Sequence, residues 1–184
     1  FVPTGMCLLV SSPDFVLLHT GMECESVMPP DICSRNAHPG NEVRIRQEWT
    51  NYQIRRLVQN LTMRGYPVYL SFFSVWQQDK YHHEWLSDHQ EALQVWSYHG
   101  RGLNFNVLTR LKDGTLTEDF FIPQTVKACR DYGFAGWHGP DGYGPLSSGN
   151  IMGTDVSDSM LSQIDFDLPE SLKEPCGDNL ESLQ

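Results

Sequence analysis

Short apolar runs recur along the chain, separated by segments in which apolar residues repeat every three or four positions. The runs cover residues 15–20, 67–73, 103–109 and 134–137. The run at 67–73 is nearly all apolar, which is typical of a strand buried on both faces. The last three runs begin 36 and 31 residues apart, the length of one strand and its connecting helix. The pattern therefore predicts four strands that alternate with helices.

Helix signals lie between these runs. Thr50 and Gln53 have the spacing of a capping box and precede apolar residues at helical intervals, and Gly65 ends that helix. Ser87 to Gln90 repeats the box before a second apolar face that ends near Gly100. A third helix is expected to begin near Glu118, with Pro123 in its first turn, and to end at Gly133. A fourth is expected from Thr154 or Asp155 to about Ile164.

Alternation of buried strands with helices predicts an α/β fold with a parallel sheet. A doubly wound sheet and a (β/α)8 barrel both satisfy it. No GxGxxG or GxxxxGK[ST] follows a predicted strand, which weakens the nucleotide-binding version of the doubly wound sheet. A full barrel needs about 250 residues, whereas this chain has 184. We therefore expect the N-terminal half of a barrel over 1–164, with 165–184 as an acidic tail or a connection to a second half.

Net charge and cysteine content argue against several classes of partner and site. A net charge of −10 argues against nucleic acid and against an anionic membrane surface as partners. No apolar run approaches the roughly 20 residues of a membrane span. The five cysteines include no CxxC pair, so the sequence predicts neither a structural zinc site nor a disulfide framework. Extracellular and cytoplasmic locations both remain open.

The residues after the predicted strands carry the candidate chemistry, because barrel sites form at the carboxyl ends of strands. They include carboxylates, aromatic rings and basic or amide groups. This combination of side chains is suited to binding a sugar. Trp faces stack on a pyranose ring, and polar groups bind its hydroxyls. The candidates are Glu23, Trp76, Arg110, Trp137, His138 and Asp141.

Residues 133–144 read GFAGWHGPDGYG, and this stretch resembles the fourth-strand motif of retaining glycoside hydrolases. It is similar to dextranase-like enzymes of glycoside hydrolase family 66, in which Gly-Phe-Asp-Gly-Trp precedes an Asp-Gly pair. Asp131 to Gly133 and Arg64 to Val68 fit the same pattern. The sequence departs from it at Ala135, where the family has Asp, and at Pro140, an added residue.

The resemblance implies a retaining glycosidase or transglycosidase acting on an oligosaccharide or polysaccharide. Asp141 would be the catalytic nucleophile, and no cofactor would be required. The general acid/base would come from a later strand outside this chain, so a second chain or segment would complete the barrel. Substrate-binding roles fall by position on Trp137, His138, Trp76, Glu23, Arg110 and Tyr143.

Three alternatives stay open. Asp141 lies in Pro-Asp-Gly, and each of these residues favours a turn without any catalytic role. The second alternative is a barrel that binds carbohydrate, or acts as a scaffold, without turnover, and it is motivated by Ala135 and by the missing second carboxylate. A self-contained doubly wound domain that binds another small polar ligand is the third reading.

Overall fold

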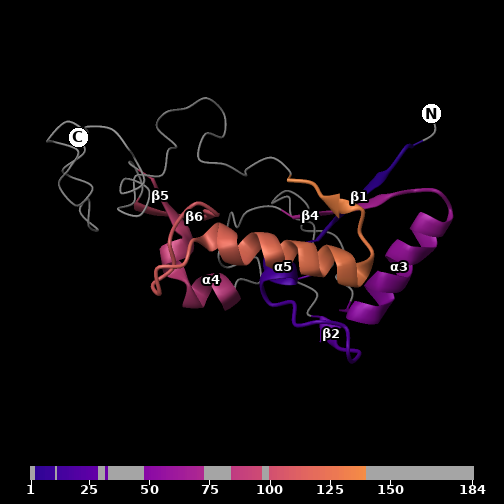
Figure 1. Ribbon diagram of the computed structural model, residues 1–184, viewed down its shortest axis with the longest axis horizontal. Helices are drawn as coiled ribbons and strands as arrows, with labels where there is room; N and C mark the ends of the chain where they lie inside the picture. Colours follow the sequence, from indigo (N-terminus) through magenta and orange to yellow (C-terminus); the bar gives the residue numbers. More distant parts are fainter. Residues whose placement is uncertain are drawn as a thin grey trace, which may run out of the picture.

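A computed structural model describes residues 3–10, 12–28, 32, 48–72, 84–96 and 100–139. Its centre is a parallel sheet of β1 (Met6–Leu9), β4 (Val68–Ser71) and β7 (Gly136–Trp137), in the order β1-β4-β7 (Figure 1). Leu70 of β4 is paired with Leu8 of β1 and with Trp137 of β7. The protein is thus mixed α/β, and its parallel strands follow one another in chain order. Both a barrel and one half of a doubly wound sheet have this order.

Two long helices connect the strands and pack against each other. α3 (Asn51–Met63) leads from β1 to β4, and α5 (Thr117–Tyr132) leads from β4 to β7. α5 extends beside the sheet, and the short α1 (Asp14–Leu17) packs against it (Figure 1). Cys7 and Tyr69, which are paired across the sheet, are exposed. Among the described residues, therefore, no helix covers that face of the sheet.

Both long helices carry the end signals that the sequence predicted. The Thr50 hydroxyl accepts from the Gln53 backbone N–H at 3.1 Å, and the Gln53 side chain accepts from the Thr50 N–H at 2.9 Å, completing the capping box. Gly65 and Gly133 follow the two helices with φ of +87° and +84°, a region that glycine adopts without a Cβ clash. β4 and β7 also lie within their predicted ranges.

The predicted strand at 15–20 is wrong. Residues Asp14–Leu17 form α1, and all four are buried. A run that is apolar on every side fits a buried helical turn as well as a buried strand, and periodicity cannot separate them. The first strand is instead β1, which lies upstream of this run.

The predicted helix from Ser87 toward Gly100 and the predicted parallel strand at 103–109 are also wrong. The chain forms α4 (Glu84–Asp88), a 3₁₀ turn (Gln90–Ala92) and then β5 (Leu93–Trp96). β5 pairs antiparallel with β6 (Gly100–Phe105) in a separate two-stranded sheet. Leu93 and Val95 alternate with polar Gln94, so this segment also has the period of a strand.

Two further details differ from expectation. Pro123 lies inside α5 and not in its first turn. The sequence analysis also did not predict β2 (Val27–Met28), which pairs antiparallel with β3 (Trp49–Thr50). The predicted helix at 154–164 and the tail at 165–184 lie outside the described residues.

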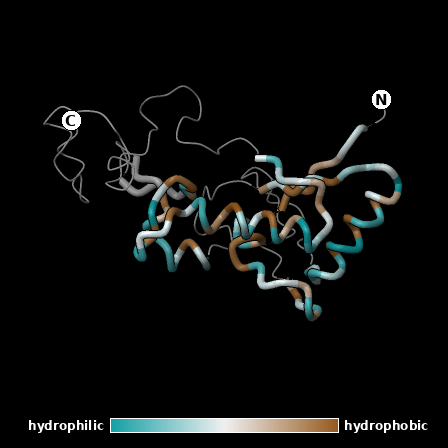
Figure 2. Tube along the Cα trace, viewed as in Figure 1, coloured by the Kyte–Doolittle hydropathy of each residue, from teal (hydrophilic) through white to brown (hydrophobic). Residues whose placement is uncertain are grey.

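A chain of aromatic rings forms the core between α5 and the carboxyl end of the sheet. Phe72 and Phe121 lie 6.2 Å apart between ring centres, and Trp137 contacts both. Phe105 links Phe121 to Trp85, which stacks on Phe120. Figure 2 shows brown, hydrophobic segments that alternate with teal, hydrophilic ones along α5. Within the described ranges, none of the helices has the length and apolar character that a membrane span requires.

Candidate functional site at the carboxyl end of the sheet

The backbone of residues 135–138 is fixed against β4. The Ala135 N–H donates to the Val68 carbonyl at 2.7 Å, and the His138 N–H donates to the Leu70 carbonyl at 2.8 Å. The Ser71 hydroxyl donates to the His138 carbonyl at 2.8 Å. Since β4 and β7 are parallel, the chain leaves the sheet after His138 at the carboxyl edge. Ligand sites of parallel α/β folds form at this edge.

Trp137 and His138 are the two predicted site residues that the structure places together at this edge. The Trp137 ring packs 5.9 Å from Phe72 and 6.1 Å from Phe121, measured between ring centres, and the residue remains 37% exposed. His138 is exposed. A Cβ at Gly139 would lie 3.0 Å from the Trp137 ring, so a glycine lets the backbone pass close beside the indole. The indole thus packs against the core, while the residue stays partly exposed at this edge.

Glu23 lies apart from this edge. It belongs to the segment between α1 and β2, which lies below α5 in Figure 1, whereas β7 lies above it. Its carboxylate lies over Gly21, where φ is +142° and an added Cβ would come within 2.5 Å of Glu23 Oε2. Glycine is therefore required at position 21, and the Glu23 carboxylate is not brought to His138.

Arg110 lies in the turn that precedes α5. Its Nη1 donates to the Gly114 carbonyl at 3.1 Å. Asp113 accepts from the Thr115 N–H at 2.9 Å, and this bond, with the Thr115 hydroxyl, lowers the pKa of Asp113. Residues 112–114 form a turn, with Gly114 at φ +86°. Trp76, Asp141 and Tyr143 lie outside the described residues.

Asp14 is a buried carboxylate that the sequence analysis did not single out. It follows the carboxyl end of β1 and is 1% exposed. Its Oδ2 accepts from the Glu84 N–H at 2.6 Å, and its own N–H donates to Ser12 Oγ at 3.1 Å. Asp14 thus joins the loop after β1 to the start of α4. The sequence analysis did not predict β1, and therefore it did not recognise that Asp14 follows the end of a strand.

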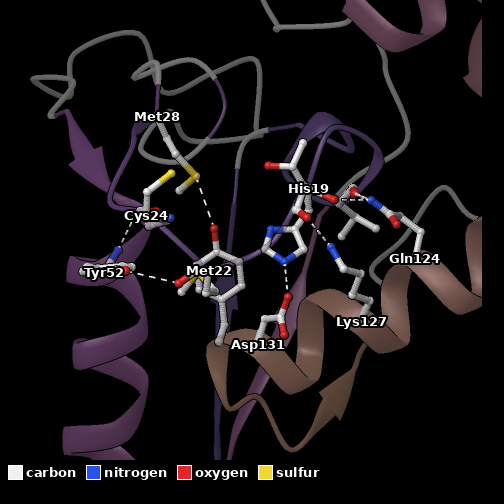
Figure 3. Close-up of polar contacts among 12 residues, drawn as sticks. His19, Met22, Cys24, Met28, Tyr52, Gln124, Lys127 and Asp131 are labelled. Carbon is white, nitrogen blue, oxygen red and sulfur yellow. Dashed lines mark hydrogen bonds and ion pairs between the residues drawn. The ribbon is translucent and has the colours of Figure 1, made fainter.

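A second polar cluster joins α5 to the segment after α1 (Figure 3). His19 Nε2 lies 2.7 Å from Asp131 Oδ2, and the His19 side chain is only 4% exposed. Gln124 and Lys127 donate to backbone carbonyls of the same segment. Asp131 lies at the end of α5 that leads into the start of β7, so this pair is far along the helix from the carboxyl edge. The His19–Asp131 pair holds the segment after α1 against α5. The sequence analysis missed the pair because its two members lie 112 positions apart.

The remaining titratable groups of the described residues include no metal-binding cluster and one buried thiol. No three His, Cys, Asp or Glu side chains there lie close enough together to hold a metal ion. Burial raises the pKa of the Cys129 thiol, which favours its protonated, unreactive form. Comparison of the chain with protein-family models, curated proteins and solved structures found no match.

Proposed function

We propose that this chain is the N-terminal part of a (β/α)8-barrel glycosidase or transglycosidase that acts on an oligosaccharide or polysaccharide with retention. The observation that carries the proposal is the parallel pairing of β7 with β4, because the chain leaves the sheet at its carboxyl edge after His138. Asp141 follows three residues later in the sequence. Barrel enzymes place their reacting groups at this edge. The resemblance of residues 133–144 to retaining glycoside hydrolases supplies the reaction class.

In the proposed reaction, a carboxylate oxygen of Asp141 bonds to the anomeric carbon while the bond to the leaving oxygen breaks. The leaving oxygen takes a proton from a second carboxyl group about 5–5.5 Å away, which we expect outside this chain. Water then releases the sugar from Asp141. The partly exposed Trp137 and the exposed His138 lie at the edge where the sugar is expected. Trp76 and Tyr143 follow predicted strands in the sequence, and the proposal expects them to contact the sugar as well.

The structure favours a narrower set of contacts than the sequence. Trp137 and His138 leave the sheet together, whereas the segment that contains Glu23 lies below α5 in Figure 1 and Arg110 contacts its own turn. The proposal therefore assigns no sugar contact to Glu23 or Arg110.

One observation favours a second candidate, a barrel that binds sugar without turnover. Position 135, where the resembled enzymes carry Asp, is Ala here. The two candidates differ in turnover and not in binding. An inactive binder should hold sugar equally well with Asp or Asn at position 141.

The test is hydrolysis of dextran and of a panel of other α- and β-glucans by the complete protein and by Asp141→Asn. Asp113→Asn is the matched control, because a glycine directly follows both Asp113 and Asp141 in the sequence, and Asn at 113 keeps an acceptor for the Thr115 N–H. We expect Asp141→Asn to lose activity on the order of 10³-fold or more, and the control to keep it. A loss of less than about tenfold would exclude Asp141 as nucleophile. Sugar binding without turnover in the unaltered protein would establish the second candidate instead.

A further inference from the structure

Ser71 is the last residue of β4, the central strand of the parallel sheet. Its backbone carbonyl accepts from the Val10 N–H at 2.8 Å, directly after β1. Its hydroxyl donates to the His138 carbonyl at 2.8 Å, directly after β7. Only 3% of Ser71 is exposed, so water competes little for either bond. One buried residue therefore holds the chain where it leaves both neighbouring strands.

The hydroxyl bond fixes the peptide group through which the chain leaves β7. The peptide before His138 is held by the backbone, because the His138 N–H donates to the Leu70 carbonyl at 2.8 Å. The peptide after it carries the His138 carbonyl, and this is the group that the Ser71 hydroxyl holds. Gly139 follows, and glycine restricts the backbone less than any other residue. The Ser71 hydroxyl thus limits the direction in which the chain leaves the strand.

Asp141 is the third residue after His138, and the proposed function makes it the nucleophile. Only Gly139 and Pro140 separate the fixed carbonyl from Asp141, and a proline restricts its own backbone and that of the residue before it. A shift of the His138 carbonyl is therefore expected to carry over to Asp141. A misplacement of about 1 Å in a reacting group can lower the rate by a factor on the order of 10².

We propose that Ser71 is a positioning residue for the reaction, and that its hydroxyl sets the placement of Asp141 through the His138 carbonyl. Ser71 itself is too buried to contact the sugar. The inference rests on the proposed function, because it gives Ser71 a part in the same reaction. A hydroxyl with a structural role alone would stabilise the sheet and leave turnover unchanged, so the two roles predict different kinetics.

Steady-state kinetics of the complete protein, on dextran or on the glucan of the panel that it hydrolyses fastest, test this role. Ser71→Ala should lower kcat by about 10- to 100-fold. KM should change by less than about threefold, because the bond from the His138 N–H to the Leu70 carbonyl remains. Ser71→Thr keeps the hydroxyl and suits a strand, so it should retain most of the activity.

Thr125→Val is the matched control. The Thr125 hydroxyl also donates to a backbone carbonyl, that of Phe121 at 2.7 Å, and Thr125 is 8% exposed on α5. Valine removes the hydroxyl and keeps the shape of the side chain. Both variants should unfold at a lower urea concentration than the unaltered protein, since each loses one buried hydrogen bond. Only Ser71→Ala should lose turnover.

Hydrogen exchange separates this inference from the proposed function, because it needs no substrate. It is read by mass spectrometry over peptides that cover 136–139 and, separately, Val10. In Ser71→Ala the His138 amide should exchange about tenfold faster or more, because the end of β7 opens more readily. The Val10 amide should not change, since its acceptor is the backbone carbonyl of residue 71 and alanine keeps it.

Slower turnover in Ser71→Ala, together with faster exchange at His138, would support the proposal. Unchanged exchange at His138 would overturn it, because the hydroxyl would then hold nothing. Faster exchange with unchanged kcat would also overturn it, as would equal losses of kcat in Ser71→Ala and Thr125→Val. Failure of the unaltered protein to hydrolyse any glucan would overturn the proposed function and this role with it, whereas the exchange result would still report on the contact itself.

Discussion

Gln124 joins two parts of the chain that are more than a hundred residues apart, and its removal gives a measurable prediction. Its Nε2 donates to the Val16 carbonyl at 3.0 Å and to the His19 carbonyl at 2.6 Å. Val16 O also accepts from the His19 N–H at 3.0 Å. Gln124→Met keeps the length of the side chain and removes its donor. We predict that this variant loosens the segment at 16–20 from α5 and lowers the free energy of unfolding.

The size of the loss follows from the two bonds. A net contribution of about 0.5–1.5 kcal/mol for each neutral hydrogen bond gives a loss of about 1–3 kcal/mol. Gln124→Glu should cost more at pH 7, because a carboxylate cannot donate and faces two carbonyl oxygens. This environment would raise the pKa of the introduced carboxyl above its unfolded value of about 4.3. The deficit is then full above the raised pKa and shrinks as pH falls toward the unfolded value, because the protonated acid regains one donor.

Urea unfolding followed by tryptophan fluorescence at pH 7 and at pH 5 measures both effects. The change in stability of Gln124→Glu relative to Gln124→Met isolates the titration of the new carboxyl, since Met does not titrate. Gln59→Met on the exposed side of α3 is the matched control and should stay within about 0.5 kcal/mol of the unaltered protein. A loss for Gln124→Met as small as that of the control would refute the contact. Equal losses for the Glu and Met variants at both pH values would refute the account of the carbonyl pair.

Three other changes test single features of the fold. Thr50→Ala removes one half of the capping box at α3 and should cost about 1 kcal/mol in urea unfolding, whereas Thr50→Ser should cost much less. Gly133→Ala should cost about 1–2 kcal/mol through its positive φ alone, because an added Cβ would meet only Val58 Cγ1, at 3.9 Å; a null result in thermal unfolding would contradict the left-handed cap. Asp14→Ala removes the acceptor of the Glu84 N–H and should cost about 1.5–3 kcal/mol. Faster amide exchange at Glu84 in that variant would identify the contact responsible.

The sequence predicted the elements whose ends carry local signals. The capping box at Thr50 and Gln53 and the glycines after each long helix need only a few neighbouring residues, and the structure has all of them. β4 is also recognisable, as a short apolar run between Gly65 and the polar residues beyond it. In these places the local pattern and the tertiary structure agree.

The errors occurred where packing and not periodicity decides the conformation. The apolar run at 15–20 is helical in its first turn because Phe15 packs against Tyr132 and Phe134, which are distant in the sequence. The segment from Leu93 is extended because it pairs with β6. Neither contact leaves a local trace in the sequence.

Only part of the candidate site was predicted, because contacts between residues distant in the sequence position the rest. Trp137 and His138 belong to a contiguous motif, so their position at the end of β7 followed from the strand itself. Glu23 was assigned to the site through a strand that is not there, and Asp14 was missed through a strand that was not predicted. The His19–Asp131 pair spans 112 positions of the chain, and no motif joins its members.

The central claim is that Asp141 forms a covalent bond to a sugar, and trapping tests it most directly. Fluorinated glycosyl fluorides have a leaving group that needs no proton, so they report the nucleophile even where the general acid lies on another chain. The account predicts that incubation with a matching reagent adds one sugar residue to the intact mass of the protein. Peptide sequencing should then place the sugar on Asp141, and Asp113→Asn should be labelled while Asp141→Asn is not. Labelling of another carboxylate, or none with any sugar that the protein binds, would contradict the claim.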